Sequence, residues 1–408
     1  MKKLSPKGVI NTLFAANAIS MTGNQLAFLA IPWFVLATTG SAVQTGVTAF
    51  FSLLPVVIAT FLGGTLIDRI GFKKASVVAD IASGLSVLLI PLLFSAGLLP
   101  FWMLQVLVFL GALLDAPGVT ARDALLPELA EAAEMPLERI ASLNQIVERG
   151  SRLLGAPAAG FLIAFISAEN VLYLNAITFA VSALLVWFMI PDIKIEKEAK
   201  IESDFFAELK EGLVYVRQEP LMLTVASIVL ITNFLDGALG SVIYPVFVNE
   251  IYGSAVGLGL IFGFSGAGAV TGALIYSRYG HTVSRRKVYV WGFIFIALGR
   301  LVLVFLPPLW ILLITSIGVG LASGPLNPVM STVSYERIPL AMRGRVLGLL
   351  RSGAFMAVPL GVLLAGYALE GIGLQPTLII VATLYLVTAT SLLINRNLYQ
   401  LDIKTASN

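Results

Sequence analysis

The sequence predicts an all-α membrane protein with twelve transmembrane helices arranged in two six-helix bundles. Three observations predict this class: long uncharged segments, basic residues confined to alternate loops, and one polar stretch after the sixth apolar segment. Of the 408 residues, 58% are apolar and 12% are charged, whereas about 25% are charged in ordinary soluble domains. The mean hydropathy is +0.93. This composition excludes a soluble globular fold.

The first uncharged segment is long enough for two helices. No Asp, Glu, Lys or Arg occurs from Gly8 through Ile67, and a helix needs roughly 20 mostly apolar residues to cross about 30 Å of hydrocarbon. The turn-like sequence Thr38-Thr39-Gly40-Ser41 separates the two crossings. Water cannot satisfy a backbone in hydrocarbon, so the crossings are predicted to be helices.

The rest of the chain continues this pattern to its C-terminal end. Apolar stretches lie near 9–37, 42–67, 75–97, 100–121, 143–167, 170–190, 221–247, 255–277, 288–306, 309–334, 346–369 and 374–394. We interpret each stretch as one crossing.

The distribution of Lys and Arg predicts the orientation of these helices. The loops after odd-numbered crossings contain no Lys or Arg; they lie near 38–42, 98–100, 168–170, 248–254, 307–308 and 370–373. Basic residues follow the even-numbered crossings instead, and short basic loops are retained in the cytoplasm. The sequence therefore predicts cytoplasmic N- and C-termini in a plasma or inner cell membrane.

A long polar stretch divides the predicted crossings into two groups of six. Within it, Ile201, Phe205, Leu209, Leu213 and Val216 recur at spacings of three and four, which predicts an amphipathic helix on the cytoplasmic surface, begun by Ser203 or Asp204. The predicted regions are a first bundle at 1–192, a linker at 193–219, a second bundle at 220–396 and a cytoplasmic tail at 397–408.

The two halves resemble each other in sequence. The second crossing ends in GTLIDRIGFKK and the eighth in GALIYSRYG; Arg149 and Pro157 are eight residues apart, as are Arg351 and Pro359. Parallel repeats of six helices are a transporter architecture, in which the halves rock about a site near the middle of the membrane.

The segment GGTLIDRIGFKK resembles the loop signature of the major facilitator superfamily. The matching residues are Gly64, Asp68, Arg69, Gly71, Lys73 and Lys74. The chain more closely resembles the drug-efflux branch that includes macrolide efflux proteins, in the stretches ELKEGLVYVRQ, RGRVLGLLRSGAFMAVPLGVLLAG and ARDALLPEL. This resemblance implies a multidrug antiporter of the kind that confers antibiotic resistance, exporting amphipathic compounds as protons enter.

The resemblance also implies roles for two motifs. In the family pattern the carboxylate of Asp68 faces the start of helix eleven, where the helix dipole favours negative charge by up to ~1 kcal/mol. This contact would form a conformational latch, although topology alone would also explain the charged loop. Gly155, Pro157 and Gly160 match an antiporter motif in helix five, whereas Gly111 stands where many proton-coupled members carry an Arg.

Charged residues inside the crossings are candidates for proton coupling, because burying charge in a membrane is costly. Asp115, Glu148, Arg149 and Arg152 are expected to form one cluster, with Asp115 and Glu148 roughly level and Arg152 one turn deeper. The cluster would be either proton-responsive or a neutralised structural network. Asp236 has no basic residue near it in sequence. We expect it to lack a partner and make it the first coupling candidate, ahead of Asp115, Glu148 and Arg152; the alternative is a hydrogen-bonded structural role.

Arg300 is expected either to extend its charge to the membrane surface or to pair structurally. Uncharged polar and aromatic residues on helices that would face a central cavity are the substrate-site candidates. They are Asn17, Asn24, Gln25, Phe28, Asn233, Phe234, Tyr244 and Asn327. The alternative for each Asn is a hydrogen bond between helices, worth about 0.6 kcal/mol.

The leading functional prediction is a secondary active exporter of hydrophobic or amphipathic drugs or related metabolites, working by alternating access with proton antiport. The expected partners are a small substrate, protons and membrane lipid, with a monomeric protein and no nucleic acid. Transport of lysophospholipids or siderophores is the alternative within the same fold, and a sugar or organic-anion importer is disfavoured because deep Lys and Arg are scarce.

A membrane enzyme or receptor is the alternative of a different class. The chain has no Cys, and its single histidine, His281, lies in a basic loop, so no catalytic triad or metal site can be assembled from these residues. The glycine run GLGLIFGFSGAGAVTG lacks nucleotide-loop spacing. Its pairs Gly259/Gly263 and Gly268/Gly272 predict close helix packing. We expect no enzyme activity, no metal and no cofactor, with the proton gradient as the energy source.

Overall fold

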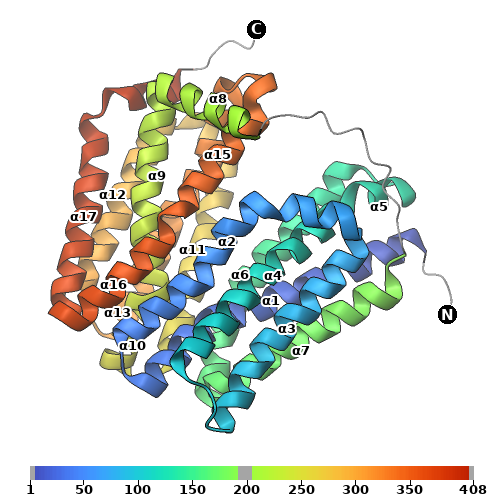
Figure 1. The fold of residues 1–408 in the computed structure, drawn as a ribbon. Helices are drawn as coiled ribbons and strands as arrows, with labels where there is room; N and C mark the ends of the chain where they lie inside the picture. Colours follow the sequence, from blue (N-terminus) through green and yellow to red (C-terminus); the bar gives the residue numbers. More distant parts are fainter. Residues whose placement is uncertain (1–4, 192–204, 404–408) are drawn as a thin grey trace. The chain divides into compact units, whose positions relative to one another are not determined.

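The computed structural model describes residues 5–191 and 205–403, with the side chains at 60–70, 205–209, 341 and 351 left out. Every regular element in these ranges is helical, as Figure 1 shows. The chain divides into two compact units. Unit 1 is Met1–Glu198 with Ser254–Gly259, and unit 2 is Ala199–Gly253 with Leu260–Asn408.

Unit 1 is a bundle of long helices. Its elements are α1 (Pro6–Thr39), α2 (Ala42–Ile70), α3 (Phe72–Ser95), α4 (Phe101–Asp123), the short α5 (Leu126–Ala132), α6 (Leu137–Ile166) and α7 (Ala168–Met189). Helix α1 packs against α2, α6 and α7, and α3 packs against α4 and α7.

Unit 2 begins with a short helix and continues as a second bundle. Its elements are α8 (Phe205–Gln218), α9 (Pro220–Ala238), η1 (Leu239–Ile243), α10 (Tyr244–Tyr252), most of α11 (Ala255–Tyr279), η2 (Gly280–Thr282), α12 (Arg285–Leu303), α13 (Leu309–Ser323), α14 (Leu326–Arg337), η3 (Leu340–Met342), α15 (Arg343–Met356), α16 (Val358–Ile372), α17 (Leu374–Ile394) and η4 (Arg396–Asp402). Helix α12 packs against α13 and α17, and α9 packs against α15 and α16.

The turns of unit 1 follow from local chemistry. The Ser5 side chain accepts a hydrogen bond from the Gly8 amide and caps α1, whose first residue is Pro6. This helix ends at Gly40, which has a φ of +67°, a conformation that glycine adopts without a steric penalty. The turn predicted at residues 38–41 is confirmed. Gly71, which joins α2 to α3, has a φ of +88°. This glycine of the loop motif therefore also allows a turn with a positive φ.

Ten helical spans among the described residues are long and apolar enough to cross a membrane, judged by length and composition. The two remaining predicted crossings also lie in helices, α6 and α12. Each of these carries several charged residues, such as Glu148 and Arg152 in α6 and Arg285 in α12, which lower the mean hydropathy. The count of twelve crossings remains a prediction.

Three predicted crossings are interrupted at a proline. A proline lacks an amide hydrogen, and its ring clashes with the carbonyl four residues earlier. Pro325 separates α13 from α14, and Pro359 lies at the start of α16, directly after α15. Pro245 follows the π-helix η1, in which the Tyr244 amide donates five residues back, to the carbonyl of Leu239. Each of these three stretches still forms one candidate span by length and composition, with a local break or π turn at the proline.

Helices α11 and α13 approach each other along a seam of glycines. A Cβ added at Gly268 or Gly272 would collide with the backbone of α13, and one at Gly320 or Gly324 with the backbone of α11. Small residues allow this close approach in membrane helices. The close packing predicted for Gly268 and Gly272 is confirmed.

Gly320→Ala is expected to destabilise the protein, whereas Gly318→Ala on the same helix is not. Alanine is favoured over glycine in a helix by up to about 1 kcal/mol at either position. At Gly320 the new Cβ would overlap the Ser265 carbonyl oxygen, while Gly318 has open space around it. The expected difference is about 1–3 kcal/mol, measured as a lower thermal unfolding temperature in detergent. Equal unfolding temperatures for the two variants would show that α11 and α13 can move apart at Gly320 without loss of stability, and would contradict this prediction.

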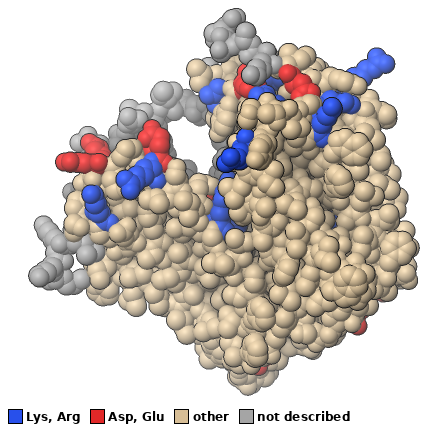
Figure 2. Space-filling model, turned by 180° about the vertical axis from the view of Figure 1, so that it is seen from behind, with Lys and Arg blue, Asp and Glu red and all other residues tan. Residues whose placement is uncertain are grey.

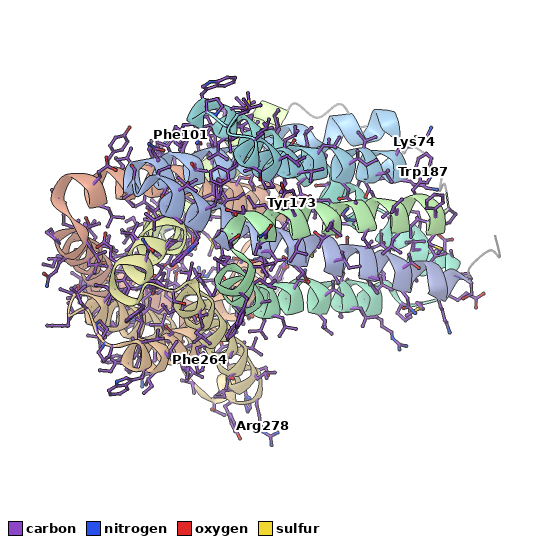
Figure 3. The ribbon with its side chains drawn as sticks, turned by 90° about the horizontal axis from the view of Figure 1, so that it is seen from below. Lys74, Phe101, Tyr173, Trp187, Phe264 and Arg278 are labelled. Carbon is purple, nitrogen blue, oxygen red and sulfur yellow. The ribbon has the colours of Figure 1, made fainter. Side chains whose placement is uncertain are left out.

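Charged side chains gather at one end of each unit on the face drawn in Figure 2, and most of the remaining visible surface is uncharged. In unit 1, Lys74 and Trp187 lie at the same end, and Phe101 lies toward the opposite end (Figure 3). The Lys73 ammonium is 5.6 Å from the centre of the Trp187 ring. This is the arrangement expected of alternating basic and uncharged loops.

The predicted amphipathic linker helix is present as α8, although its predicted start at 203 or 204 lies outside the described residues. It packs against α15. The Glu211 carboxylate is 2.6 Å from the Arg345 guanidinium, and the Tyr215 hydroxyl donates to the Arg337 carbonyl at 2.9 Å. These contacts hold α8 against α14 and α15 within unit 2.

Candidate functional site

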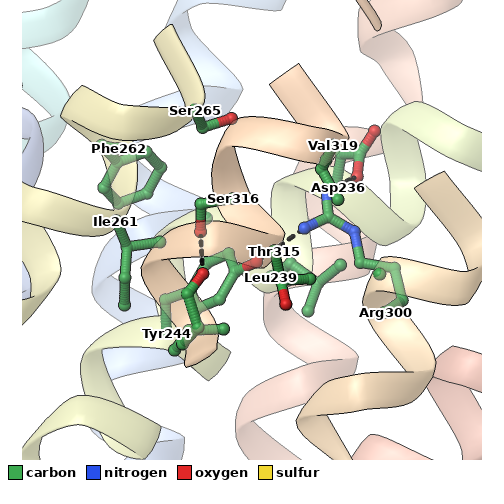
Figure 4. A pocket seen from close by; sticks show the side chains of 13 residues that line it. Asp236, Leu239, Tyr244, Ile261, Phe262, Ser265, Arg300, Thr315, Ser316 and Val319 are labelled. Carbon is green, nitrogen blue, oxygen red and sulfur yellow. Dashed lines mark hydrogen bonds and ion pairs between the residues drawn. The ribbon is translucent and has the colours of Figure 1, made fainter. Parts of the chain in front are cut away.

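Unit 2 contains a cavity of about 170 Å³ among α9, η1, α10, α11, α12 and α13 (Figure 4). Its lining is mixed, with charged, hydroxyl and apolar side chains. The lining residues are Asp236, Leu239, Gly240, Tyr244, Ile261, Phe262, Ser265, Gly299, Arg300, Leu312, Thr315, Ser316 and Val319. Ligand pockets are commonly apolar cavities with a few polar groups of this kind.

An ion pair lies in the wall of this cavity. Arg300 Nη2 donates to Asp236 Oδ1 at 2.9 Å, and the Tyr385 hydroxyl donates to Oδ2 at 3.1 Å. Arg300 Nη1 donates to the Tyr244 hydroxyl oxygen at 2.6 Å. The Asp236 side chain is 40% exposed and that of Arg300 is 13% exposed, so the carboxylate is the more accessible partner.

The local sequence explains how these groups meet. Asp236 and Gly240 lie about one turn apart, and both line the cavity. The π turn before Pro245 widens the helix by one residue, and Tyr244 follows that turn. Such π turns inside helices occur often at functional sites. Arg300 comes from the last turn of α12.

The prediction that Asp236 has no charged partner is wrong. Its partner, Arg300, lies 64 residues away in sequence, in a different helix. A search of the nearby sequence could not find it, because helices pair through the fold and not along the chain. Of the two behaviours predicted for Arg300, the structure contains the pairing.

The remaining polar groups of the cavity are partly free. The hydroxyls of Thr315 and Ser316 donate to carbonyls one turn earlier, at 2.8 Å each, which leaves their oxygen lone pairs as acceptors. The Nε of Arg300 is buried and has no hydrogen-bond partner among the described residues. Phe262 packs edge-on against Tyr244, with 5.9 Å between ring centres. The cavity can thus hold a small charged or polar group against an aromatic wall.

Unit 1 contains a different ion pair, which sequence reasoning missed. Arg122 Nη1 lies 2.9 Å from both carboxylate oxygens of Asp80, and the Ser182 hydroxyl donates to Oδ2 at 2.7 Å. Arg122 also donates to the hydroxyls of Ser76 and Ser20. Neither charged side chain has any exposed surface. The available indication was Asp80 itself, a charge inside a predicted crossing.

Asp115 lies in unit 1 with an uncharged partner. Asn24 Nδ2 donates to Asp115 Oδ2 at 2.8 Å, and Oδ1 is buried without a hydrogen-bond partner among the described residues. A second amide pair lies along the same helix, where Asn17 donates to Asn144 at 3.1 Å. Asn17 and Asn24, two of the four predicted cavity residues of α1, therefore form hydrogen bonds between helices.

The predicted cluster of Asp115 with the charges of helix five does not form. Glu148 instead pairs with Arg152 one turn along α6, at 2.7 Å, and Arg149 is exposed. Among the described residues no hydrogen bond or ion pair joins Asp115 to any of these three. The Arg152 side chain is 67% exposed, as a solvated pair on one helix face would be.

The loop and helix-five motifs are placed only in part. The side chains of Gly64, Asp68 and Arg69 lie outside the described residues, so the predicted latch stays a prediction. Lys73 lies against Trp187, and Lys74 is exposed.

In helix five, Gly155 packs so closely that an added Cβ would come within 2.6 Å of the Gln25 Cβ. Gly160 is buried and Pro157 is half-buried within α6. The motif therefore has a packing role in unit 1, beside a predicted cavity residue.

The eight predicted cavity residues do not gather in the unit 2 pocket. Tyr244 lines it, and the other seven lie elsewhere in the described structure. Asn233 donates to the Ala354 carbonyl of α15 at 2.8 Å. Phe234 is half-buried, and Phe28 and Asn327 are exposed. No group of three His, Cys, Asp or Glu that could hold a metal occurs in the part of the chain that the structure describes.

Two bundles of long apolar helices, with a charged pair at an internal cavity of unit 2, are typical of a polytopic membrane protein. The Major Facilitator Superfamily model matches residues 13–235 and 226–400. The chain belongs to this superfamily, which is a family of transporters and not an enzyme class, and it is therefore a membrane protein.

Two multidrug efflux pumps named Tap are similar over nearly the whole chain. That of Mycolicibacterium fortuitum is 32% identical over 90% of this chain and 90% of its own length. That of Mycobacterium tuberculosis strain H37Rv is 30% identical over 93% of this chain and 91% of its own. Macrolide efflux protein A of Streptococcus pyogenes is 21% identical over 96% of this chain and 97% of its own length. The predicted resemblance to drug-efflux members of the family is confirmed.

Solved structures show the same fold. The nucleoside transporter NupG superposes with a TM-score of 0.79 over 95% of this chain and 99% of its own, at 13% identity. A bacterial homologue of the iron transporter ferroportin superposes with a TM-score of 0.67 over 94% of this chain and 98% of its own, at 15% identity.

Proposed function

We propose that this protein is a secondary active transporter that exports hydrophobic or amphipathic drugs, or related metabolites, in exchange for protons. The similarity to two multidrug efflux pumps supports the substrate class. One observation of the structure carries the coupling: the Asp236–Arg300 pair lies in the wall of a cavity and is partly exposed to it. A charge pair in that position can bind a proton or contact a substrate that enters the cavity.

Proton entry acts on this pair through its carboxylate. A proton that binds an oxygen of Asp236 leaves a neutral acid and an unpaired guanidinium, so the attraction that holds Arg300 against α9 is lost. Arg300 then keeps the Tyr244 hydroxyl and the two tyrosine rings as partners among the described residues, and the charge attraction between α9 and α12 is gone. Loss of the proton restores the pair. The cycle links protonation to a change in helix packing without any cofactor.

Asp115 is the second proton site. Among the described residues it has no cation within hydrogen-bond distance, and one of its oxygens is buried there without a hydrogen-bond partner. An ionised carboxylate in that setting is costly, and a proton on the free oxygen relieves the cost.

The remaining features of the proposal concern topology and the transport cycle. The protein has twelve crossings, cytoplasmic termini and a monomeric form in the cell membrane, where it contacts lipid. Asp68 forms the latch at the start of helix eleven, and the two units alternate access to the substrate. The alternating basic loops support the crossings and the termini, and the resemblance of the loop motif to the family signature supports the latch.

Efflux of ethidium from cells expressing the protein is expected to stop when a protonophore collapses the proton gradient. Antiport uses that gradient directly, whereas an ATP-driven pump does not. The measurement is ethidium fluorescence in preloaded cells with and without protonophore, with ATP levels followed in parallel and cells lacking the protein as the control. Efflux that persists at full rate after the gradient is gone would overturn the coupling.

A further inference from the structure

The Arg300 guanidinium lies in surroundings suited to an organic cation. Asp236 supplies a carboxylate at 2.9 Å. The centres of the Tyr244 and Tyr385 rings lie 5.9 and 5.8 Å from the guanidinium carbon, within the range of cation–π attraction. Proteins recognise quaternary ammonium groups by aromatic rings placed around the cation, and a carboxylate adds attraction between opposite charges. Here the protein's own side chain fills it.

We propose that Asp236, Tyr244 and Tyr385 form a binding subsite for an alkylammonium group, which Arg300 occupies in the absence of a ligand. We call these three residues the cation cage. The proposal rests on the proposed export function, because it assigns amine-bearing substrates to that site. Arg300 then acts as a tethered competitor, which a ligand cation must displace from the carboxylate.

The cavity provides the space for the ligand. It adjoins the Asp236–Arg300 pair, holds about 170 Å³, and has an apolar wall that includes Ile261, Phe262 and Leu312. The Asp236 side chain is 40% exposed, so a cation in the cavity can reach it. Arg300 Nε has no hydrogen-bond partner among the described residues, so moving the guanidinium breaks no bond at that atom.

The ion pair of unit 1 shows what a purely structural pair looks like in the same protein. Arg122 is surrounded by Asp80 and serine hydroxyls, and in the described part of unit 1 no aromatic ring is in cation–π contact with it. Both of its charged side chains are fully buried. The pair in unit 2 differs in two ways. Tyrosines, which present aromatic rings as well as hydroxyls, take the place of the serines, and the pair borders a cavity.

The test measures binding of choline to purified protein by isothermal titration, with 3,3-dimethylbutan-1-ol as its uncharged isostere. Removing the tethered competitor in Arg300→Met is expected to lower the Kd of choline by roughly ten- to hundredfold, with no comparable change for the isostere. Adding Asp236→Asn to that variant is expected to abolish the gain. Arg152→Met, at the exposed pair in α6, is the control and is expected to bind like the wild type.

Equal gains for choline and the isostere would mean that Arg300→Met only opens an apolar void, and would overturn the proposal, as would an unchanged choline Kd. If Arg300→Met does not remain folded, Arg300→Gln removes the charge and keeps a hydrogen-bond donor, and the same comparison applies.

The rings are tested separately. In the Arg300→Met background, Tyr385→Phe is expected to retain choline binding and Tyr385→Leu to lose it; equal binding by the two would contradict the role of the ring. These titrations use no proton gradient, so their outcome is independent of the coupling test. Choline binding can fail the prediction while efflux is proton-driven, and it can meet the prediction while efflux is not proton-driven.

Discussion

Arg122→Met is expected to lower the free energy of unfolding by about 3–5 kcal/mol, because it leaves the Asp80 carboxylate charged and without a cation inside unit 1. Both side chains are fully buried, and Ser182 alone would remain to donate to that carboxylate among the partners described. Reversible unfolding in mixed SDS and detergent micelles measures this loss directly.

The double variant Asp80→Leu/Arg122→Met separates charge from packing. Replacing a buried ion pair by apolar residues of similar size is often neutral or stabilising, so the double variant is expected to be more stable than the single one. Arg152→Met, which removes an exposed pair on one helix, is the control and should cost about 0.5 kcal/mol or less. Equal loss of stability in the single and double variants would show that the pair stabilises unit 1 through its packing and not through its charges.

Asp236→Asn is expected to abolish uphill export, which would fall to the level of vesicles without protein. Asparagine cannot take up a proton and release it again in the working pH range, so the gradient has nothing to act on at this site. Substrate accumulation in proteoliposomes with an imposed pH gradient measures the effect.

Asp236→Asn also leaves Arg300 without its carboxylate, so its loss of function needs a structural control. Asp236→Asn/Arg300→Gln removes both charges and keeps hydrogen-bonding groups at both positions. It is expected to unfold near the wild-type temperature, to allow movement of substrate down its own gradient and to give no uphill accumulation. Uphill export by this double variant would remove Asp236 from the coupling.

The helices could be predicted from the sequence because membrane segments must be helical and apolar over a fixed length. The turn at Gly40 followed from its residue types in the same way. The interruptions at Pro245, Pro325 and Pro359 were not predicted, because a proline can end, bend or widen a helix depending on the neighbouring helices that satisfy the freed carbonyl. The π turn before Pro245 is one of these outcomes, and it lines the cavity.

Only one charged residue of the candidate site, Asp236, could be predicted from the sequence, because burying a charge in a membrane costs free energy. Asp236 stood out as a charge in an apolar segment, and so did Asp80, although only the first was selected. Their partners, Arg300 and Arg122, lie 64 and 42 residues away along the chain. Pairing across helices depends on rotation and depth in the bundle, which one sequence without its fold does not contain. For the same reason Asp115 was grouped with Glu148, whereas it contacts α1.

Proton movement into or out of proteoliposomes when substrate is added, followed with an enclosed pH-sensitive dye, tests the central claim most directly. The account predicts that ethidium added to one side drives protons in the opposite direction in vesicles with the wild-type protein, and drives none in vesicles with Asp236→Asn/Arg300→Gln. Ethidium transport by the wild-type protein without any accompanying proton movement would contradict it.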